Sequence, residues 1–175
     1  MSILVISENS NESLKSSTLN TISAASIISK DIHVLVVGNK CKKVVEKIAK
    51  IKLVTKILHL DNEKFDNPIA ENIAPVIISL ADKYSHIIAP ASTYGKNFMP
   101  RVAAILDLSQ ISDVIKIESE DTFIRPIYAG NALATIKSTD SKKIITVRPT
   151  SFDTISTEGG SAEIEKLNIN INDCK

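Results

Sequence analysis

Polar and charged residues gather just after an apolar run that ends near residue 90. Thr93, Gly95, Lys96 and Arg101 bring a hydroxyl group, a flexible backbone and two cations to a loop that passes into a helical pattern. A helix N-terminus offers free N–H groups and a partial positive charge, so these residues are candidates for an anion-binding loop. The plainer alternative is that Lys96 and Arg101 pair with carboxylates, since the chain has only five glycines with which to build a phosphate cradle.

The segment 122–132 holds a second candidate site. It places Arg125 and Tyr128 among apolar residues, with Asn131 in a turn beside Gly130. Arginine and tyrosine are typical anchors of protein–protein interfaces, because each combines a large apolar body with polar groups. Arg125, Tyr128 and Asn131 are therefore candidates for a partner interface, and internal packing of the same residues is the alternative with equal weight.

The histidines and the internal cysteine give weaker signals. His33, His59 and His86 each lie in or beside a predicted strand, without a His, Cys or carboxylate at a metal-site spacing, so a structural role is expected for them. Cys41 opens a predicted helix, where a thiolate would be stabilised, although a small structural residue is the simpler interpretation. The motifs GxSxG, HExxH, GxGxxG and the P-loop are absent from the sequence. We expect no catalytic residues and no metal site.

The spacing of apolar residues predicts the elements that position these candidates. Continuous aliphatic runs at 3–6, 32–37, 56–60 and 86–90 predict strands, and helical periodicity predicts helices at 12–29, 44–49 and 69–80. Pro75 either kinks the last of these helices or marks a late start capped by Asn72. A further helix is expected to begin at a cap on Asn97, with Pro100 in its first turn. This alternation predicts a doubly wound α/β fold with a mostly parallel sheet and helices on both faces.

The pattern changes after residue 107. Strand-like runs at 111–118, 122–128, 133–137 and 143–148 follow without a helix between them, which predicts an antiparallel extension of the parallel sheet. We expect an α/β domain over 1–150. Residues 151–175 are polar and contain Gly159 and Gly160, so they are expected to form an arm or linker, with Ile164 and Leu167 as candidate contacts to the surface.

Composition narrows the classes of partner. The 175 residues carry a net charge of +1 and only 4% aromatic residues, which gives no reason to expect nucleic acid or an acidic membrane surface as a partner. Cys41 and Cys174 lie far apart and form no CxxC motif, so a reducing compartment is expected. The first residues resemble a strand rather than a targeting segment, and no apolar run approaches membrane-spanning length. These features predict a soluble cytoplasmic protein.

Several segments, in order along the chain, resemble the N-terminal domain of the α subunits of electron transfer flavoproteins. The resemblance is carried by residues 1–6, 70–75, 95–104, 110–113, 125–132, 146–149 and 159–162. It implies a heterodimer with a β subunit, and electron transfer through FAD from flavin dehydrogenases to a membrane quinone oxidoreductase. It also implies a bacterial cytoplasm or, alternatively, a mitochondrial matrix.

The resemblance implies that FAD binds mainly in a second α-subunit domain, whose flavin motifs do not occur in this sequence. We therefore expect a scaffold and β-subunit-contact domain, neither an enzyme nor able to bind FAD alone. A nucleotide-binding module of the universal-stress-protein kind is the alternative, but it needs a glycine-rich loop where 92–97 has one glycine. An ATP-pyrophosphatase-type enzyme would need a Ser-Gly-Gly loop where residues 7–9 read Ser-Glu-Asn.

Overall fold

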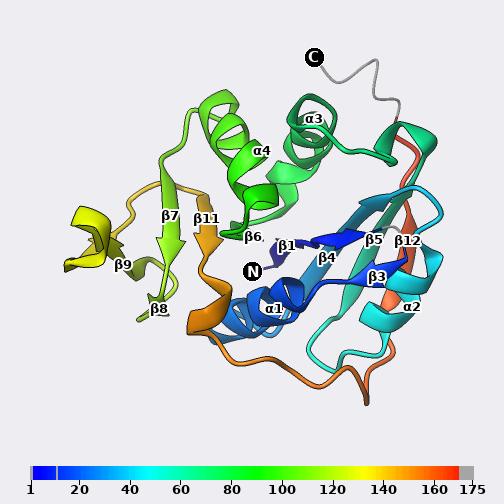
Figure 1. Ribbon diagram of the computed structural model, residues 1–175, viewed down its shortest axis with the longest axis horizontal. Helices are drawn as coiled ribbons and strands as arrows, with labels where there is room; N and C mark the ends of the chain where they lie inside the picture. Colours follow the sequence, from blue (N-terminus) through cyan, green and yellow to red (C-terminus); the bar gives the residue numbers. More distant parts are fainter. Residues whose placement is uncertain (1, 11, 170–175) are drawn as a thin grey trace.

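The central layer of the molecule is a seven-stranded sheet in which every neighbouring pair of strands is parallel (Figure 1). The computed structural model describes residues 2–10 and 12–169. Strands buried on both faces explain the continuous aliphatic runs of the sequence. In sheet order the strands are β12 (Glu163–Lys166), β5 (Lys56–Asp61), β4 (Ile32–Gly38), β1 (Ile3–Ile6), β6 (His86–Pro90), β11 (Lys143–Val147) and β7 (Gln110–Val114).

Helices cover both faces of this sheet. The helices α1 (Ser16–Ile28) and α2 (Lys42–Ala49) lie on one face, while α3 (Ala70–Leu80) and α4 (Thr93–Ile105) lie on the other (Figure 1). Side chains alternate along β1, so that Ile3 packs in the core beneath α1 and α2, whereas Leu4 packs in the core beneath α3 and α4. The predicted doubly wound α/β class is confirmed.

Helix α1 begins later than its periodicity predicts. It starts at Ser16, because two short strands, β2 (Asn9–Ser10) and β3 (Ser13–Leu14), form a hairpin over residues expected to be helical. The hydroxyl of the buried Thr18 donates to the carbonyl of Glu8 at 2.9 Å and accepts from its N–H at 2.8 Å. The Thr18 side chain therefore holds the backbone of Glu8, and with it the segment that precedes α1, against the first turn of the helix.

Both proline-containing helices continue through their prolines. Helix α3 starts at Ala70 and keeps Pro75 inside it, so the late start at Asn72 is wrong. Helix α4 starts at Thr93, so the predicted cap at Asn97 is wrong as well. For α3 the alternative in which the helix runs past Pro75 holds, whereas in α4 a local signal further along the helix was mistaken for its N-terminus.

A separate antiparallel sheet provides the crossover between β7 and β11. It consists of β8 (Lys116–Ile117), β9 (Thr122–Ile127) and β10 (Ala132–Lys137). The expectation that 143–148 belongs to the antiparallel part is wrong, since β11 returns to the main sheet between β6 and β7 and pairs in parallel with both. The buried side chains of Ile117 and Phe123 anchor the small sheet in the core beneath α1.

After β11 the C-terminal stretch runs along the lower side of the view in Figure 1, from orange to red, and ends at β12 beside β5. The Asn20 side-chain amide donates to the Phe152 carbonyl at 2.6 Å, and the Gly160 N–H donates to the Lys50 carbonyl at 2.8 Å. Beyond these contacts, β12 extends the sheet beside β5. Leu167 packs against the core beneath α3 and α4, while Ile164 is 45% exposed.

Short 3-10 turns complete the described chain. They are η1 (Glu63–Phe65), η2 (Ala81–Lys83), η3 (Tyr128–Gly130) and η4 (Pro149–Ser151). None of the helices within residues 2–10 and 12–169 has the length and hydropathy that a bilayer-spanning helix needs.

Candidate functional site

The expected anion-binding loop forms the first turn of helix α4. The Ser92 hydroxyl caps this turn by accepting a hydrogen bond from the Gly95 N–H at 3.4 Å. Thr93 and Lys96 are exposed here, and Arg101 is exposed one turn further along. The structure thus places all four candidate residues on one helix, and their binding of an anion remains a prediction.

Two of these residues have structural roles of their own. A Cβ atom on Gly95 would lie 2.0 Å from the Pro90 carbonyl oxygen, so the absence of a side chain lets α4 pack directly against the end of β6. The Arg101 guanidinium lies 3.8 Å from the Glu71 carboxylate of α3. For Arg101, the structure therefore supports the alternative that it pairs with a carboxylate of the chain.

The strand order reverses between β1 and β6, which is the position where doubly wound sheets bind dinucleotides. In this chain the connection after β1 is the β2–β3 hairpin, and the first glycine of the sequence is Gly38. Burial, and secondarily the nearby Glu8, raises the pKa of Tyr94 at the start of α4 above its usual range. The described residues at this position therefore do not fit the pyrophosphate of FAD. They offer the Glu8 carboxylate, which repels phosphate, and no glycine-rich turn after β1.

Asp113 and Arg148 form an ion pair at the ends of β7 and β11. The Arg148 Nε donates to Asp113 Oδ1 at 3.1 Å, and its Nη2 contacts the other carboxylate oxygen. This guanidinium, together with the nearby Lys96 and Arg125, holds the pKa of Asp113 below its usual value. The structure thus brings cations from both predicted sites toward one carboxylate.

The predicted partner residues lie on the hairpin formed by β9 and β10, far from the helices α2 and α3 (Figure 1). Tyr128 is 80% exposed at its tip, and Asn131 is also exposed. Tyr128 and Ala129 have φ angles of 50° and 54°, a left-handed conformation that is costly for residues with side chains. Arg125 is half-buried on β9, and its Nε is a buried donor without a hydrogen-bond partner among the described residues.

Two of the three histidines have partners that explain them. His33 contacts the Tyr84 hydroxyl through Nδ1 at 2.9 Å and the Asp31 carboxylate through Nε2 at 3.3 Å. His86 contacts the Ser85 hydroxyl at 2.8 Å and the Glu120 carbonyl oxygen at 2.7 Å. Both imidazoles are satisfied on each ring nitrogen, as a structural role requires.

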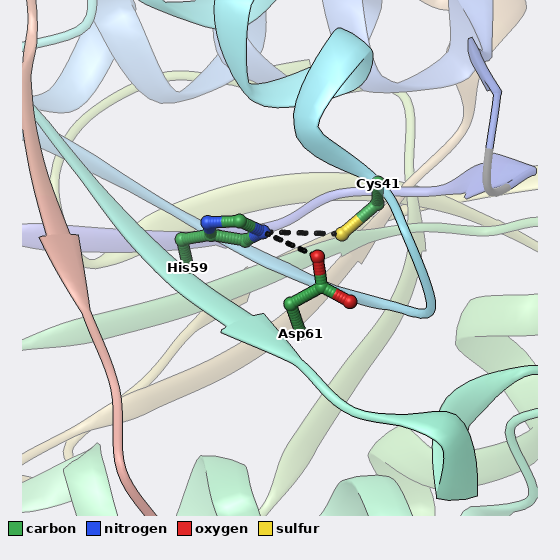
Figure 2. A group of neighbouring side chains, drawn as sticks. All are labelled: Cys41, His59 and Asp61. Atoms are coloured by element: carbon green, nitrogen blue, oxygen red, sulfur yellow. Dashed lines mark hydrogen bonds and ion pairs between the residues drawn. The ribbon is translucent and has the colours of Figure 1, made fainter.

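The third histidine belongs to a side-chain cluster, hereafter the Cys–His–Asp cluster, formed by Cys41, His59 and Asp61 (Figure 2). His59 Nε2 lies 3.4 Å from Cys41 Sγ and 3.7 Å from an Asp61 carboxylate oxygen. Burial lowers the pKa of His59. Burial, reinforced by Asp61, raises the pKa of the Cys41 thiol to about 11.

This cluster bears on the expectations for His59 and Cys41. The sequence predicts a structural role for His59 because no ligand stands at a metal-site spacing, but the fold places Cys41 and Asp61 beside it. The raised pKa of Cys41 disfavours a thiolate, in agreement with the simpler interpretation of Cys41 as a small structural residue. The parallel pairing of β4 with β5 brings Gly38 opposite Asp61, so the loop after β4 meets the end of β5. The sequence did contain a signal for the cluster, because Cys41 follows β4 and Asp61 ends β5, two consecutive predicted strands whose carboxyl ends meet at one edge of a parallel sheet.

The fold defines a three-layer α/β domain of the doubly wound class. The small antiparallel sheet of β8, β9 and β10 is inserted in the chain before β11. Residues 3–172 match the family model described as the electron transfer flavoprotein domain. The chain therefore belongs to the electron transfer flavoprotein family.

Curated relatives specify the subunit that it resembles. The chain is 52% identical over 167 residues to the electron transfer flavoprotein subunit alpha of Pseudomonas aeruginosa, covering 95% of this chain and 54% of that protein. It is 48% identical over 173 residues to the mitochondrial subunit alpha of Dictyostelium discoideum, covering 94% and 49%. The corresponding protein of Paracoccus denitrificans is 44% identical over 165 residues, covering 94% and 53%. The chain spans about half the length of these relatives.

Proposed function

We propose that this chain is the N-terminal scaffold and β-subunit-contact domain of an electron transfer flavoprotein α subunit. The observation that carries the proposal is the family match over residues 3–172 together with 52% identity to an α subunit of about twice the length. The chain serves as part of an electron carrier and catalyses no reaction of its own. The proposed division places the α/β domain at residues 1–150 and an arm that leads toward a flavin domain at residues 151–175, with β12 of this arm completing the sheet of the domain.

The β9–β10 hairpin is the proposed contact surface for the β subunit. Its buried root at Phe123 holds it rigidly, while its tip presents Tyr128 and Leu133 with exposed fractions of 80% and 64%. The buried Nε of Arg125 lacks a hydrogen-bond partner among the described residues, so an acceptor on a partner protein would satisfy it. Tyrosine and arginine are enriched among the anchor residues of protein–protein interfaces, so Tyr128 beside Arg125 fits such a surface.

FAD is proposed to bind in the complete heterodimer and not to this chain alone. The β2–β3 hairpin, rather than a glycine-rich turn, follows β1. The candidate anion-binding loop at residues 93–96 forms the first turn of α4. FAD would supply the redox chemistry of the whole protein, while the residues of this chain hold neighbouring domains in position. Flavin dehydrogenases and a membrane quinone oxidoreductase are then partners of the assembled protein, in a bacterial cytoplasm or alternatively a mitochondrial matrix.

Complex formation tests the proposal directly. The purified chain is mixed with the electron transfer flavoprotein β subunit of the same organism, and the mixture is followed by size-exclusion chromatography with light scattering. A one-to-one complex is expected. As a matched control, a universal stress protein replaces the β subunit, and no complex is expected with it. Persistent absence of a complex with the β subunit contradicts the contact role.

Absorption spectroscopy tests the flavin part of the proposal. The chain purified alone after expression in flavin-rich medium is expected to be colourless, and added FAD is expected to pass through a desalting column separately. A flavin spectrum at stoichiometric level in the purified chain contradicts the proposal. The β-subunit experiment and this one fail independently, so their outcomes distinguish the two parts.

A further inference from the structure

The Cys–His–Asp cluster has the composition and spacing of a metal site. Cys41 comes from the start of α2, His59 from within β5 and Asp61 from the end of β5, and Figure 2 shows their polar atoms pointing toward one another. One potential ligand atom from each residue lies within 4.8 Å of the others. Among residues 2–10 and 12–169 this is the group of His, Cys and carboxylate side chains that meets such a criterion.

Two of the three separations between ligand atoms agree with those around a tetrahedral ion. Zinc lies about 2.3 Å from a thiolate, 2.0 Å from an imidazole nitrogen and 2.0–2.2 Å from a carboxylate oxygen. Tetrahedral angles then place neighbouring ligand atoms roughly 3.4–3.6 Å apart. The contacts of His59 Nε2 with Cys41 Sγ and with Asp61 Oδ2 are 3.4 Å and 3.7 Å, and the Cys41 sulfur lies within 4.8 Å of an Asp61 oxygen.

The carboxylate is held in place by a backbone contact. The Asp61 Oδ1 atom accepts a hydrogen bond from the Lys40 N–H at 2.7 Å, which leaves the other oxygen near His59. Lys40 itself has a left-handed φ of 57°, so this N–H belongs to a specifically turned loop. Groups that orient a ligand in this way contribute to metal affinity, because they fix the ligand before the ion arrives.

A pocket adjoins the cluster and leaves room for a further ligand. It encloses about 220 Å³ and is lined by His59, Asp61, Lys166, Leu167 and Asn168. The side chain of His59 is only 8% exposed, whereas that of Asp61 is 37% exposed, so solvent reaches the cluster from the carboxylate side. The ammonium of Lys166 opposes a cation here, but Lys166 is exposed and its charge is screened by water.

We propose that Cys41, His59 and Asp61 form a binding site for a divalent transition-metal ion of the zinc class, with water from the adjoining pocket as the fourth ligand. Thiolate and imidazole ligands favour such an ion over magnesium or calcium. Cys41 gives its thiol proton to solvent as the sulfur–metal bond forms, so binding releases a proton and transfers no electron. The site, at α2 and β5, lies far from the β9–β10 hairpin that is the proposed contact surface for the β subunit (Figure 1).

Cobalt(II) serves as the probe, because it replaces zinc and reports its ligands by absorption. The full chain, reduced and freed of metal, is titrated with cobalt(II). A stoichiometric sulfur-to-cobalt charge-transfer band is expected, together with visible bands of tetrahedral intensity. Added zinc is expected to bleach these bands and to raise the melting temperature of the metal-free chain.

Matched variants separate this site from others. Cys41→Ser is expected to remove the charge-transfer band, while Cys174→Ser, outside the described residues, is expected to keep it. His59→Gln is expected to weaken binding at least about 100-fold, since loss of a group that only orients a ligand already costs about 10- to 100-fold. The control His33→Gln is expected to leave the affinity unchanged, because His33 pairs with Tyr84 and Asp31.

Two further variants keep the test interpretable if Cys41→Ser unfolds. Asp61→Asn retains an acceptor for the Lys40 N–H and is expected to weaken binding at least about 10-fold. Lys166→Gln removes the opposing charge and is expected to tighten binding a few-fold. Absence of the cobalt bands in the folded wild-type chain overturns the proposal. Equal affinity of the wild type and the folded His59→Gln and Asp61→Asn variants also overturns it.

Discussion

Gly95 is the residue at which helix α4 approaches strand β6 most closely. Its missing side chain avoids the Pro90 carbonyl oxygen, which an added Cβ would meet at 2.0 Å. The contact is with backbone, so no change of rotamer can relieve it. Helix propensity alone favours alanine over glycine by about 1 kcal/mol, so packing and propensity predict opposite signs.

Gly95→Ala is therefore expected to destabilise the fold by about 3 kcal/mol, because overpacking outweighs the gain in propensity. Urea unfolding followed by circular dichroism measures this change. Asn97→Ala, at an exposed position of the same helix, is the control. Its free energy of unfolding should lie within about 0.5 kcal/mol of the wild-type value. A Gly95→Ala chain as stable as the wild type would show that α4 can move away from β6.

Asp113 is a second residue with a measurable role. Its pKa lies below the usual 3.8, chiefly because of the Arg148 guanidinium, so the folded state favours the carboxylate. The resulting stability is present above the unfolded-state pKa and is lost as the pH falls through the lowered folded-state pKa. Arg148 is 41% exposed, which limits the expected effect to about 1 kcal/mol.

Asp113→Asn keeps the shape of the side chain and tolerates the left-handed φ of 60°, but it removes the charge. We expect it to be about 1 kcal/mol less stable at neutral pH, with the difference shrinking as the pH falls below 3.8. Thermal unfolding across this pH range measures the difference. Asp153→Asn, on an exposed loop, is the control. A deficit that persists unchanged in acid would contradict a role for the charge.

At the scale of single residues, the sequence identified the relevant types but not all of their partners. Arg101 pairs with a carboxylate, as one of the two alternatives held. His59 was assigned a structural role because its neighbours Cys41 and Asp61 follow no ligand motif. The proximity of Cys41 depends on the pairing of two strands, which no short sequence window contains.

At the scale of elements, the β9–β10 hairpin has a buried root and an exposed tip. Phe123 is fully buried at one end, while Tyr128 is 80% exposed at the other. The residues Tyr128, Ala129 and Gly130 all have positive φ angles, a conformation that costs energy for the two with side chains. Backbone strain of this kind persists where the surrounding structure imposes it and clusters at functional sites, which supports a contact role for the tip.

Tyr128→Ala is expected to weaken binding of the β subunit about 30-fold, corresponding to about 2 kcal/mol, because an exposed anchor acts in the complex alone. Arg125→Ala should act in the same direction. Isothermal titration gives the affinities, and the melting temperature of the free chain should stay within about 2 °C for Tyr128→Ala. Lys137→Ala, exposed at the root of the hairpin, is the control. Unchanged binding with a collapsed melting temperature would identify a packing site instead.

The elements themselves were largely predictable, while their boundaries and some pairings were not. Continuous aliphatic runs predicted β1, β4, β5 and β6, because parallel strands are buried on both faces. The start of α4 was missed because Asn97 and Pro100 are themselves good N-terminal signals, yet Ser92 makes the cap. The parallel pairing of β11 was missed because a small sheet, rather than a helix, provides its crossover.

At the scale of the whole molecule, the C-terminal stretch joins distant parts of the fold. Gly160 passes so close to Ile51 that an added Cβ would lie 2.4 Å from its carbonyl oxygen. The neighbouring Ala162 N–H donates to the Ala49 carbonyl at 2.9 Å. These contacts guide the chain from η4 to β12.

Gly160→Ala is expected to release part of this stretch, at a cost of about 2 kcal/mol, because the backbone contact with Ile51 cannot form. Limited proteolysis should then cut within 151–169 several-fold faster than in the wild type. Ser161→Ala, exposed at the next position, is the control and should digest at the wild-type rate. Equal digestion of Gly160→Ala and wild type would show that the close approach is not needed.

The order of strands at this scale could not be read from the sequence. Doubly wound topology followed from alternating strands and helices, because right-handed crossovers leave few arrangements. The return of Glu163–Lys166 to the sheet links residues that are about a hundred positions apart, since Lys56 pairs with Glu165 at 2.8 Å. Only the folded chain brings such positions together.

Strand β12 also determines what the border of the sheet presents to other molecules. Without it, β5 would end the sheet with unpaired amides beside the buried side chains of Ile57 and Leu58. Such a border is a template for adding strands from neighbouring copies, as in amyloid growth. Two glutamates and a lysine in β12 replace it with a charged rim. Strand β12 thus acts as a gatekeeper against aggregation, and the growing chain is most vulnerable after β5 has emerged from the ribosome and before β12 has followed it.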